Sequence, residues 1–387
     1  MKILILGFGK TGQAVYDFLI KRSEEVYVYD QKVIDIENYY SYDRLKKEMP
    51  FFDLCIRSPG ISKLSKIYLL CVNLAKKIVS DIEFSLPYIK SKHLICVTGS
   101  NGKTSTCLMI NHIMKNRVNT YLLGNIGEVL ISSVDKIEEN DIVIIELSSF
   151  MLEDTYSLKP EVAIITSLSP NHLNETISLE AYYASKKRLL INGFDKIICD
   201  DKTAEIMNIN DYNFQFYNID FFNTVFNKNA NLAIECCKYY GISEEESRRA
   251  LLDFNLPNYR QEVIKISNGL TFVNDSKSTS SDSTNSCLEE YDNQKRILIL
   301  EGIFKGNNIL EFDLDKVDVI YSYGEISALL PSFVIKKDTL KEILIDIHDR
   351  NYSSHVVIFS PGGSSLDLYK SYMDRGEEFN KLVNLIW

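Results

Sequence analysis

The chain has 387 residues, of which 45% are hydrophobic and 25% charged, and its formal net charge is −10. This length allows two or three domains with separate cores, and the composition is typical of a folded globular protein. The acidic balance argues against a general nucleic-acid binder, because phosphate backbones are held by basic surfaces. No apolar run reaches the roughly 18 residues that span a bilayer, and the chain starts directly on a predicted strand without a targeting leader, so we expect no membrane insertion.

The eight cysteines are scattered through the chain, mostly in apolar stretches, and no two have the C-x-x-C spacing. This pattern is typical of reduced thiols and not of a disulfide framework or a zinc site. The sequence therefore predicts a soluble cytoplasmic protein.

A buried strand at 2–6 leads into the turn Gly7-Phe8-Gly9-Lys10-Thr11-Gly12, and a helix follows to about residue 20. A second strand at 26–30 ends in Asp30. The pattern G-x-G-x-x-G between a strand and a helix, with an acid after the next strand, is the fingerprint of a dinucleotide-type phosphate site. It predicts a binding site for a nucleotide diphosphate without identifying the nucleotide.

A further strand at 53–57 ends at Ser58-Pro59-Gly60, a loop in which glycine permits close approach of the backbone. Residues 1–92 are therefore predicted to form a small Rossmann-like domain with its ligand at the carboxyl ends of the strands.

The apolar run Leu94-Ile95-Cys96-Val97 ends in Thr98-Gly99-Ser100-Asn101-Gly102-Lys103-Thr104-Ser105, after which the sequence suits a helix. Glycines let backbone N–H groups approach phosphate oxygens, the helix N-terminus adds partial positive charge, and Lys103 adds a full one. Thr104 carries the hydroxyl that such loops offer to Mg²⁺. Two residues separate Gly99 from Gly102 where the usual pattern has four, but the segment still predicts an ATP-binding P-loop at the start of a second α/β domain.

Three later segments could complete this site. The buried strand at 141–146 ends in Glu146, where a sheet with a phosphate loop needs a Mg²⁺ ligand. His172 follows the buried strand at 162–168, although a single histidine in a loop is often only solvated. Residues 182–189 suit a helix with a basic face, which on its own could be a solvated charge cluster. Residues 121–127, in contrast, are predicted to form a plain turn.

The sequence Asn255-Leu-Pro-Asn-Tyr259 interrupts the helical pattern, so we place the second domain at 93–257 and the third at 258–387. The third domain repeats one arrangement, in which a buried strand is followed by a loop rich in Gly, Ser and Lys and then by a helix. The strands end at Asn274-Asp275-Ser276-Lys277, at Gly302–Gly306 and at Pro361–Ser365. A third, Rossmann-like α/β domain is therefore predicted, with polar loops along one sheet edge.

Five of these stretches, in this order, resemble the motifs of the Mur ligases: Val97–Thr104, Gly124-Asn-Ile-Gly127, Glu146-Leu-Ser-Ser-Phe150, Tyr182-x-x-x-Lys186-x-Arg188 and Asn274–Lys277. The resemblance extends from the first glycine turn to Arg375-Gly376, nearly the whole chain. It implies a three-domain α/β ligase with a UDP-binding domain, a central P-loop domain that binds ATP, and a third domain for the incoming amino acid. The stretches at 146–150, 274–277 and 360–367 point to the branch that adds D-glutamate to UDP-N-acetylmuramoyl-L-alanine.

The resemblance also implies roles for individual residues. The UDP-substrate would be held by Gly9, Lys10, Thr11, Gly12, Asp30, Ser58, Pro59, Gly60, Asn125 and Ser148. ATP would be held by Gly99, Ser100, Asn101, Gly102, Lys103, Thr104, Ser105, Arg260 and Asp275. D-glutamate would be received by Thr279, Lys305, Ser365 and Tyr372. The catalytic set would be Lys103, Glu146, His172 and Lys186, and two Mg²⁺ ions would be held by Thr104, Glu146, His172 and a carbamylated Lys186.

The implied reaction has two steps in peptidoglycan precursor synthesis. The carboxylate of the nucleotide-sugar substrate attacks the γ-phosphate of ATP to give an acyl phosphate, and the amine of D-glutamate then displaces phosphate. We expect the enzyme to be a monomer. The sequence departs from the family where Asn171 and Asn174 flank His172, where Leu300-Glu301-Gly302 replaces Leu-Gly-Gly, and in an asparagine-rich helix near Asn227.

Three alternatives remain at this point. The chain could be a Mur-superfamily ligase that uses another amino acid, such as a folylpolyglutamate synthase, although that branch lacks an equivalent of the first domain. It could be a P-loop kinase or NTPase whose first domain senses a dinucleotide. It could also be a binding module that has kept the fold and lost the chemistry.

Overall fold

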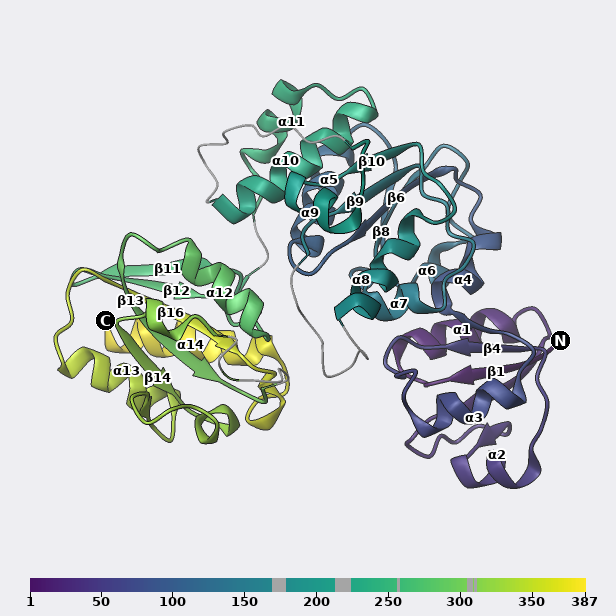
Figure 1. Ribbon diagram of the computed structural model, residues 1–387, viewed down its shortest axis with the longest axis horizontal. Helices are drawn as coiled ribbons and strands as arrows, with labels where there is room; N and C mark the ends of the chain where they lie inside the picture. The colour runs from purple at the N-terminus through teal and green to yellow at the C-terminus, as the bar shows by residue number, and fades with distance from the viewer. Residues whose placement is uncertain (169–178, 213–223, 256–257, 305–308, 310–311) are drawn as a thin grey trace. The chain divides into compact units, whose positions relative to one another are not determined.

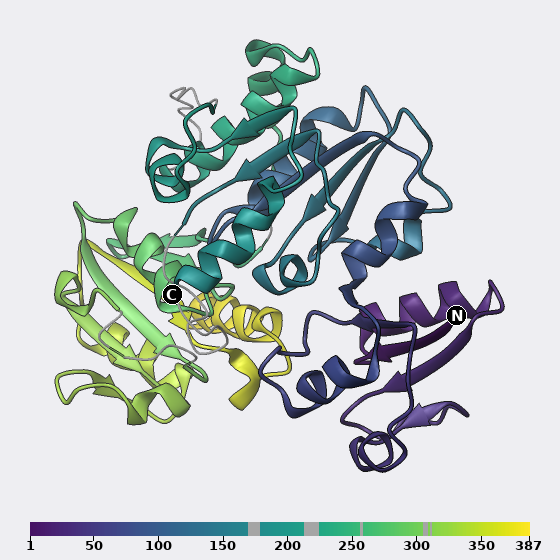
Figure 2. The same cartoon turned by 45° about the vertical axis from the view of Figure 1, so that its right-hand side comes forward.

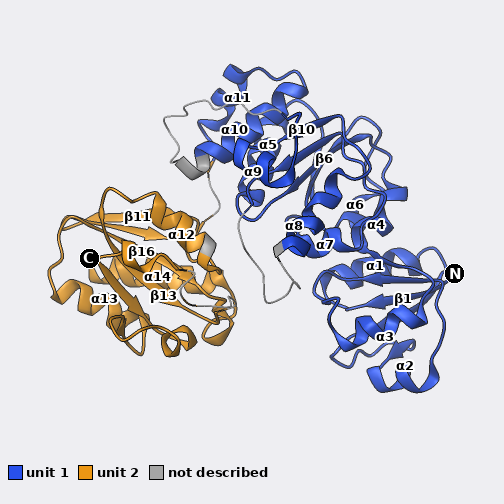
Figure 3. Cartoon of the chain, in the orientation of Figure 1, with its two compact units in different colours: residues 1–168, 178–221, 226–254 blue, residues 169–177, 222–225, 255–387 orange. Residues whose placement is uncertain are grey.

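The computed structural model describes residues 1–168, 179–212, 224–255, 258–304, 309 and 312–387. These residues form two compact units, shown in blue and orange in Figure 3. Unit 1 contains most of the described chain up to Phe254, and unit 2 contains Asn255–Trp387 together with the described residues 224 and 225. Unit 1 contains two parallel sheets and unit 2 one mixed sheet, so each predicted domain has a sheet of its own.

The first sheet is entirely parallel, with the strand order β3-β2-β1-β4-β5. Its strands are β1 (Lys2–Leu6), β2 (Glu25–Tyr29), β3 (Tyr39–Tyr40), β4 (Leu54–Arg57) and β5 (Ile78–Ser80). Its helices are α1 (Lys10–Ile20), α2 (Tyr42–Glu48), α3 (Lys66–Leu74) and α4 (Asp81–Ser85), with the short 3₁₀ turn η1 (Leu86–Tyr88). This is the Rossmann strand order, and ligands bind such sheets where the order reverses, beside the central strand β1.

The second sheet is also parallel, with the order β10-β9-β6-β8-β7. Its strands are β6 (His93–Thr98), β7 (Thr120–Gly124), β8 (Ile142–Glu146), β9 (Val162–Ile165) and β10 (Lys196–Ile198). The helices and 3₁₀ turns that follow them are α5 (Lys103–Met114), α6 (Leu130–Ser133), α7 (Ser149–Glu153), α8 (Leu179–Lys187), η2 (Arg188–Leu190), α9 (Asp201–Met207), α10 (Thr224–Tyr239) and α11 (Glu244–Leu251). The plain turn expected at 121–127 is wrong in its first half, because Tyr121 to Gly124 belong to the edge strand β7.

Alternation of side chains along β6 explains how this sheet is covered on both faces. Leu94 and Cys96 join the core formed with α7, η2 and α9, and the intervening residues face the opposite side. Helix α5 contacts β6, β7 and β8, and the helices around the sheet can be followed in Figures 1 and 2. The loops after β6, β8 and β9 open at the same edge, because all three strands run parallel.

The sheet of unit 2 has the order β11-β12-β16-β13-β14-β15, and only β11 runs antiparallel to its neighbour among the described strands. Its strands are β11 (Glu262–Ser267), β12 (Leu270–Asn274), β13 (Lys295–Glu301), β14 (Val319–Ser322), β15 (Ile335–Lys336) and β16 (His355–Gly362). Its helices and 3₁₀ turns are α12 (Ser281–Glu289), η4 (Leu314–Lys316), η5 (Glu325–Ala328), α13 (Leu340–Asp349), η6 (Ser365–Asp367) and α14 (Tyr372–Ile386). The predicted polar loops follow β12, β13 and β16, which are neighbours in this sheet.

All eight cysteines are free thiols, and all are buried. None of the helices in the described part of the chain combines the length and apolarity that a membrane span requires.

Candidate active site

The first glycine turn packs against the loop after β4. Ser58 Oγ donates to the carbonyl of Gly7 at 2.9 Å, and Asp30 Oδ2 accepts from the N–H of Phe8 at 2.7 Å. Gly12 has no room for a side chain, since a Cβ there would lie 1.9 Å from the Gly7 carbonyl oxygen. The structure thus brings the turn at 7–12, Asp30 and the Ser58-Pro59-Gly60 loop together at the switch point of the first sheet.

Arg57, the last residue of β4, joins the first sheet to the second. Its Nε donates to Asp154 Oδ2 at 2.6 Å, and its Nη2 donates to the Phe150 carbonyl at 2.6 Å. Arg57 and Asp154 are both buried, at 1% and 0% exposed. Lys10 Nζ adds a second link by donating to the Gly127 carbonyl at 2.9 Å. The loops proposed to hold the nucleotide sugar are therefore held against the second sheet.

The phosphate loop needs glycine at two positions. Gly99 has φ +148°, and a Cβ there would lie 2.1 Å from Thr166 Oγ1. Gly102 has φ +82°, and its Cβ would lie 2.3 Å from Asn229 Oδ1. The short loop is thus closely packed between β9 and α10, and a side chain at either glycine would be strained as well as crowded.

Two lysines converge on the same carbonyl of this loop. Lys103 Nζ donates to the carbonyls of Gly99 and Ser100 at 2.8 and 2.7 Å, and Lys186 Nζ donates to the Gly99 carbonyl at 2.7 Å. Lys186 is only 1% exposed, so the reading of residues 182–189 as a fully solvated charge cluster is wrong. Burial, with the charge of Lys103 in addition, lowers the pKa of Lys186 well below its usual value.

Glu146 ends β8 next to this loop, in register with Val97. It is 1% exposed, and its Oε1 accepts from Asn125 Nδ2 at 2.6 Å. Its other oxygen, Oε2, is buried and accepts no hydrogen bond from the part of the chain that the structure describes. A buried carboxylate with one unpartnered oxygen fits a cation ligand, because such an oxygen is costly to leave unsatisfied.

Other predicted ligands are placed less directly. Thr104 lies in the first turn of α5, and Ser148 Oγ caps α7 by accepting from the Met151 N–H at 3.3 Å. His172 lies outside the described residues. Across the described ranges, no group of three or more His, Cys, Asp or Glu side chains could hold a metal ion.

Asn229 is a residue that the sequence analysis missed. It lies on α10, is 4% exposed, and its amide oxygen lies against Gly102 in the phosphate loop. In the sequence, the asparagine-rich helix near Asn227 could have indicated it, but that helix departs from the family pattern.

Unit 2 gathers its predicted residues at the carboxyl edge of its sheet. Asp275 is buried, and its Oδ2 accepts from Ser278 Oγ at 2.5 Å and from Ser360 Oγ at 2.7 Å. Burial raises the pKa of Asp275 to about 6, against the opposing effect of these bonds and the charge of Arg260.

The residues proposed to receive the amino acid surround the same edge. Thr279 is exposed and Ser365 is buried. Tyr372 lies beside both Ser276, whose Oγ donates to its carbonyl at 2.8 Å, and Lys277, whose Nζ lies 4.1 Å from its ring centroid. Lys305 lies outside the described residues.

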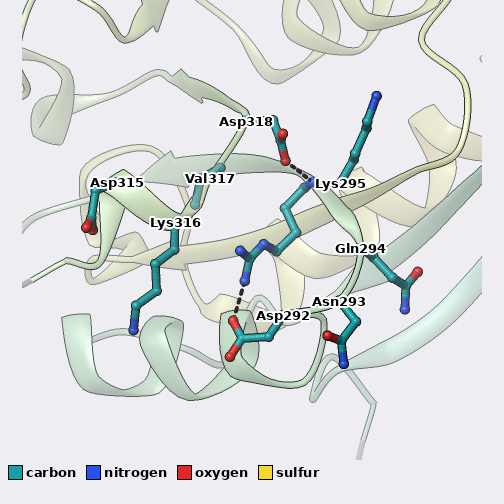
Figure 4. Close-up of a pocket in the computed structure, with 9 residues that line it drawn as sticks. Asp292, Asn293, Gln294, Lys295, Asp315, Lys316, Val317 and Asp318 are labelled. Atoms are coloured by element: carbon teal, nitrogen blue, oxygen red, sulfur yellow. Dashed lines mark hydrogen bonds and ion pairs between the residues drawn. The ribbon is translucent and has the colours of Figure 1, made fainter.

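A polar groove in unit 2 lies elsewhere and is not this site. Figure 4 shows it at the amino ends of β13 and β14, lined by residues 292–296 and 315–318. Arg296 Nη1 donates there to Asp292 Oδ1 at 2.6 Å, and its backbone N–H donates to Asp318 Oδ2 at 2.8 Å. The predicted binding loops follow the opposite, carboxyl ends of the strands.

A family model described as the Mur ligase middle domain matches residues 97–257. A protein named UDP-N-acetylmuramoylalanine--D-glutamate ligase from Petrotoga mobilis is 27% identical over 431 residues and is aligned over 99% of both chains. One of the same name from Francisella tularensis subsp. novicida is 28% identical over 408 residues, which cover 99% of this chain and 95% of the relative.

Solved structures of similar fold include the MurF ligase of Thermotoga maritima in complex with ADP, with TM-score 0.61 and 15% identity over 99% of this chain and 95% of that one. The UDP-N-acetylmuramate-alanine ligase MurC of the same organism gives TM-score 0.58 and 17% identity over 100% and 99%. At these identities the likeness concerns the fold. Fold, phosphate loop and relatives together define an ATP-dependent ligase that forms carbon–nitrogen bonds. Residues 97–257 thus match the middle domain of the Mur ligases, and relatives named UDP-N-acetylmuramoylalanine--D-glutamate ligase align with nearly the whole chain.

Proposed function

We propose that this enzyme adds D-glutamate to UDP-N-acetylmuramoyl-L-alanine with hydrolysis of ATP to ADP and phosphate. The structural observation that carries the proposal is the convergence of Lys103, Lys186 and Glu146 around one short phosphate loop. The choice of D-glutamate rests on the name shared by relatives that align with 99% of the chain.

The nucleotide-sugar end of the reaction would lie in unit 1. The loops at 7–12 and 58–60 would hold the UDP, with Asp30 fixing the first of them through the Phe8 N–H. The link from Lys10 to Gly127 places the first loop near Asn125, the residue proposed to contact the muramoyl-alanine part. The substrate's terminal carboxylate would then point toward Glu146 and the phosphate loop.

The phosphate end would use the P-loop residues 99–105, with Lys103 neutralising charge on the transferred phosphoryl group. Lys103 lies at the N-terminus of α5, so the helix dipole adds to its field. In this conformation its ammonium donates to two loop carbonyls, and we expect it to turn to ATP when ATP binds. Asn229 would support the loop from α10, and Arg260 and Asp275 would contribute from unit 2.

Thr104 and Glu146 would hold one Mg²⁺ ion. The support comes from Glu146, whose Oε2 is buried and accepts no hydrogen bond from the described residues. His172 and a modified Lys186 would hold a second. Bound Mg²⁺ supplies charge neutralisation between a carboxylate and a phosphate that otherwise repel each other. The chain's own contribution is to hold the two anions in line and to keep water out.

Lys186 would carry a carbamate. Only a neutral amine attacks carbon dioxide, forming an N–C bond and releasing one proton, and the lowered pKa of Lys186 favours that neutral form. The product is an anion, which suits a position where Lys103 already supplies positive charge. An ammonium at the same place would repel Mg²⁺.

The amino acid would be received by Thr279, Lys305, Ser365 and Tyr372 after the phosphoryl step, and its amine would displace phosphate from the acyl phosphate. We keep the domain limits 1–92, 93–257 and 258–387, a monomeric enzyme and a cytoplasmic location as parts of the proposal. The eight free thiols support the location, because such thiols persist in a reducing compartment.

The test is phosphate release by the purified full chain with ATP, Mg²⁺ and UDP-N-acetylmuramoyl-L-alanine, with and without D-glutamate. We expect turnover to require D-glutamate and to reject L-glutamate and D-aspartate. Lys103→Met should reduce turnover by roughly 10²–10³-fold, whereas Lys92→Met, at an 83% exposed side chain, should leave it unchanged. Turnover without any amino acid would favour a P-loop NTPase, and a requirement for another amino acid would make this a different ligase of the superfamily.

A further inference from the structure

Arg375, on α14, is fully buried and ties together the carboxyl ends of three strands in unit 2. Its Nε donates to Ser276 Oγ at 3.0 Å and its Nη2 to the Ser276 carbonyl at 2.7 Å, just after β12. Its Nη1 donates to the Gly363 carbonyl at 3.1 Å, after β16, and also to Glu301 Oε2, at the end of β13. One guanidinium therefore fixes three neighbouring loops.

Glu301 is 0% exposed and supplies the carboxylate of this cluster. Its Oε1 is buried and accepts no hydrogen bond within the described ranges, and the same holds for Asp367 Oδ1. The two carboxyl groups lie close together, because a Cβ built on Gly324 would be 2.8 Å from Asp367 Oδ2 and 3.5 Å from Glu301 Cγ. Asp367 Oδ2 accepts from the Glu325 N–H at 3.1 Å.

Two carboxyl groups and one guanidinium are neutral together when they hold one proton. Burial raises the pKa of Glu301 to about 8, with Arg375 opposing and Asp367 adding to the rise. Among the described residues, Tyr323 and Tyr369 also face the cluster, and their hydroxyls lie 3.0 Å apart. The pKa of each tyrosine is raised by burial, with Glu301 contributing to both.

Glu378 completes these surroundings by acting on Tyr369 from α14. Since the two tyrosines and Glu301 all favour their neutral forms, we expect the cluster to hold its proton at neutral pH.

Two of the described residues proposed to receive the amino acid, Thr279 and Ser365, lie on loops that Arg375 fixes, and the third, Tyr372, lies on the helix of Arg375 itself. Thr279 follows Ser276 by three positions, Ser365 follows Gly363 by two, and Tyr372 precedes Arg375 by three. Main-chain bonds also join these loops in pairs: Ile303 and Ser364 exchange two, at 2.8 and 2.9 Å, and the Gly362 N–H donates to the Ser278 carbonyl at 3.0 Å. Arg375 adds a side-chain link that reaches all three loops.

We propose that Glu301 is a positioning residue for the incoming amino acid: it holds Arg375, and Arg375 holds the three loops in the geometry that receives the substrate. This inference rests on the proposed function, since it concerns the amino-acid site. It predicts that replacing Glu301 weakens binding of the amino acid and leaves binding of ATP and of the nucleotide sugar unchanged.

The first experiment compares Michaelis constants for three substrates. Glu301→Ala should raise KM for D-glutamate by roughly ten-fold or more, with KM for ATP and for the nucleotide sugar within about two-fold of wild type. Glu301→Gln keeps the shape of the protonated side chain, so it should restore most of the affinity at pH 7. The control is Asp292→Asn, which breaks the Asp292–Arg296 pair at the opposite end of β13 and should leave all three KM values unchanged.

Equal increases in all three constants would mean a general loss of structure and would overturn the proposal. So would an unchanged KM for D-glutamate in Glu301→Ala, or no difference between the Ala and Gln variants.

The pH dependence gives an independent readout. When pH rises through about 8, wild type loses the proton of Glu301 and gains a buried negative charge, so KM for D-glutamate should increase. Glu301→Gln should lack this increase. The amine of D-glutamate titrates identically with both enzymes, so the difference between them isolates Glu301, and parallel profiles would contradict the shared proton.

Hydrogen–deuterium exchange of the free enzyme separates this inference from the proposed function. Glu301→Ala should accelerate exchange at 276–279, 302–304 and 362–366 together, whereas Asp292→Asn should not. If wild type proved to use another amino acid, the KM comparison would apply to that amino acid. If it used none, the proposed function and the amino-acid role would both fail, and exchange would still decide whether Glu301 couples the three loops.

Discussion

Unit 1 buries two cations, Arg57 and Lys186, and surrounds them differently. Arg57 is held by the carboxylate of Asp154 at 2.6 Å and by main-chain carbonyls. Lys186 donates to a loop carbonyl, and the charge that acts on it is another cation, Lys103. A paired cation costs little to keep charged, whereas an ammonium in this second environment is costly and is pushed toward its neutral, reactive form.

The different surroundings of Arg57 and Lys186 indicate different roles for these two side chains. Arg57 links the two sheets, whereas under the proposed function Lys186 would be kept in an unfavourable environment because its reaction requires the neutral amine. Such sites commonly exchange stability for activity.

The largest expected effect is on activity at Lys186. Lys186→Ala should lose roughly 10²–10³-fold in turnover, because an anionic metal ligand disappears. Part of the activity should return with formate, which can occupy the position of the carbamate. The measurement is phosphate release at saturating substrates, together with thermal unfolding, where the variant should match or exceed wild type because a buried, poorly solvated polar group is removed.

The matched control is Lys187→Ala, the neighbouring and exposed residue, which should keep full activity. Wild-type turnover in Lys186→Ala would refute the carbamate, and a large loss of stability would mean that Lys186 is structural like Arg57.

The second effect is on stability at Arg57. Arg57→Met leaves the buried Asp154 with the partly exposed Lys63 as its ion-pair partner, and it should cost about 3 kcal/mol of unfolding free energy because one buried member of a charge pair is removed. Arg44→Met removes an exposed i,i+4 pair with Glu48 and should cost about 0–1 kcal/mol. Urea denaturation followed by circular dichroism measures both.

The double variant Arg57→Met/Asp154→Leu should recover part of the loss, because the buried carboxylate is removed together with the guanidinium. If it is no more stable than Arg57→Met alone, the pairing with Asp154 does not explain the role of Arg57.

The smallest effect concerns Asp81, a titratable side chain near the junction of the two sheets of unit 1. Burial raises the pKa of Asp81 from 3.8 to about 7, although Arg57 opposes the shift. The folded state therefore holds a proton that the unfolded state releases, and Asp81 should reduce stability progressively as pH rises from about 4 to 7. The Tm of Asp81→Asn relative to that of wild type should rise by a few °C between about pH 4 and 7, and the difference should stay constant at higher pH.

Asp35→Asn, at an exposed position, should show no such trend. A constant difference between Asp81→Asn and wild type from pH 4 to 8 would mean that Arg57 keeps both acids ionised.

Local pattern was sufficient for the central strands and for the phosphate loop, but it predicted a turn where the edge strand β7 lies. The loop after β6 was readable because its glycines, lysine and threonine are contiguous, and Glu146 was readable because it ends an apolar run. The order of the strands in each sheet depends on pairing between segments far apart in the chain, which local pattern does not reveal. The motifs and the family resemblance nevertheless predicted the three-domain α/β architecture.

The missed features all depend on partners far apart in the chain. Arg57 looked like the end of an ordinary strand, and its partner Asp154 is 97 residues away. Glu301 looked like a departure from the family at one position, and its meaning depends on Arg375, 74 residues further on. Asn229 was not predicted because its helix does not match the family pattern, although its side-chain amide packs against the phosphate loop.

The buried cysteines offer a way to follow the two units separately. The core of the first sheet contains Cys55 and Cys71, the second contains Cys96 and Cys199, and Cys287 lies in the core of unit 2. A thiol reagent in solution reaches a buried sulfur only when its surroundings open. Identifying which cysteines a slow reagent labels first would therefore rank the sheets by their opening rates, with the protein's own side chains as reporters.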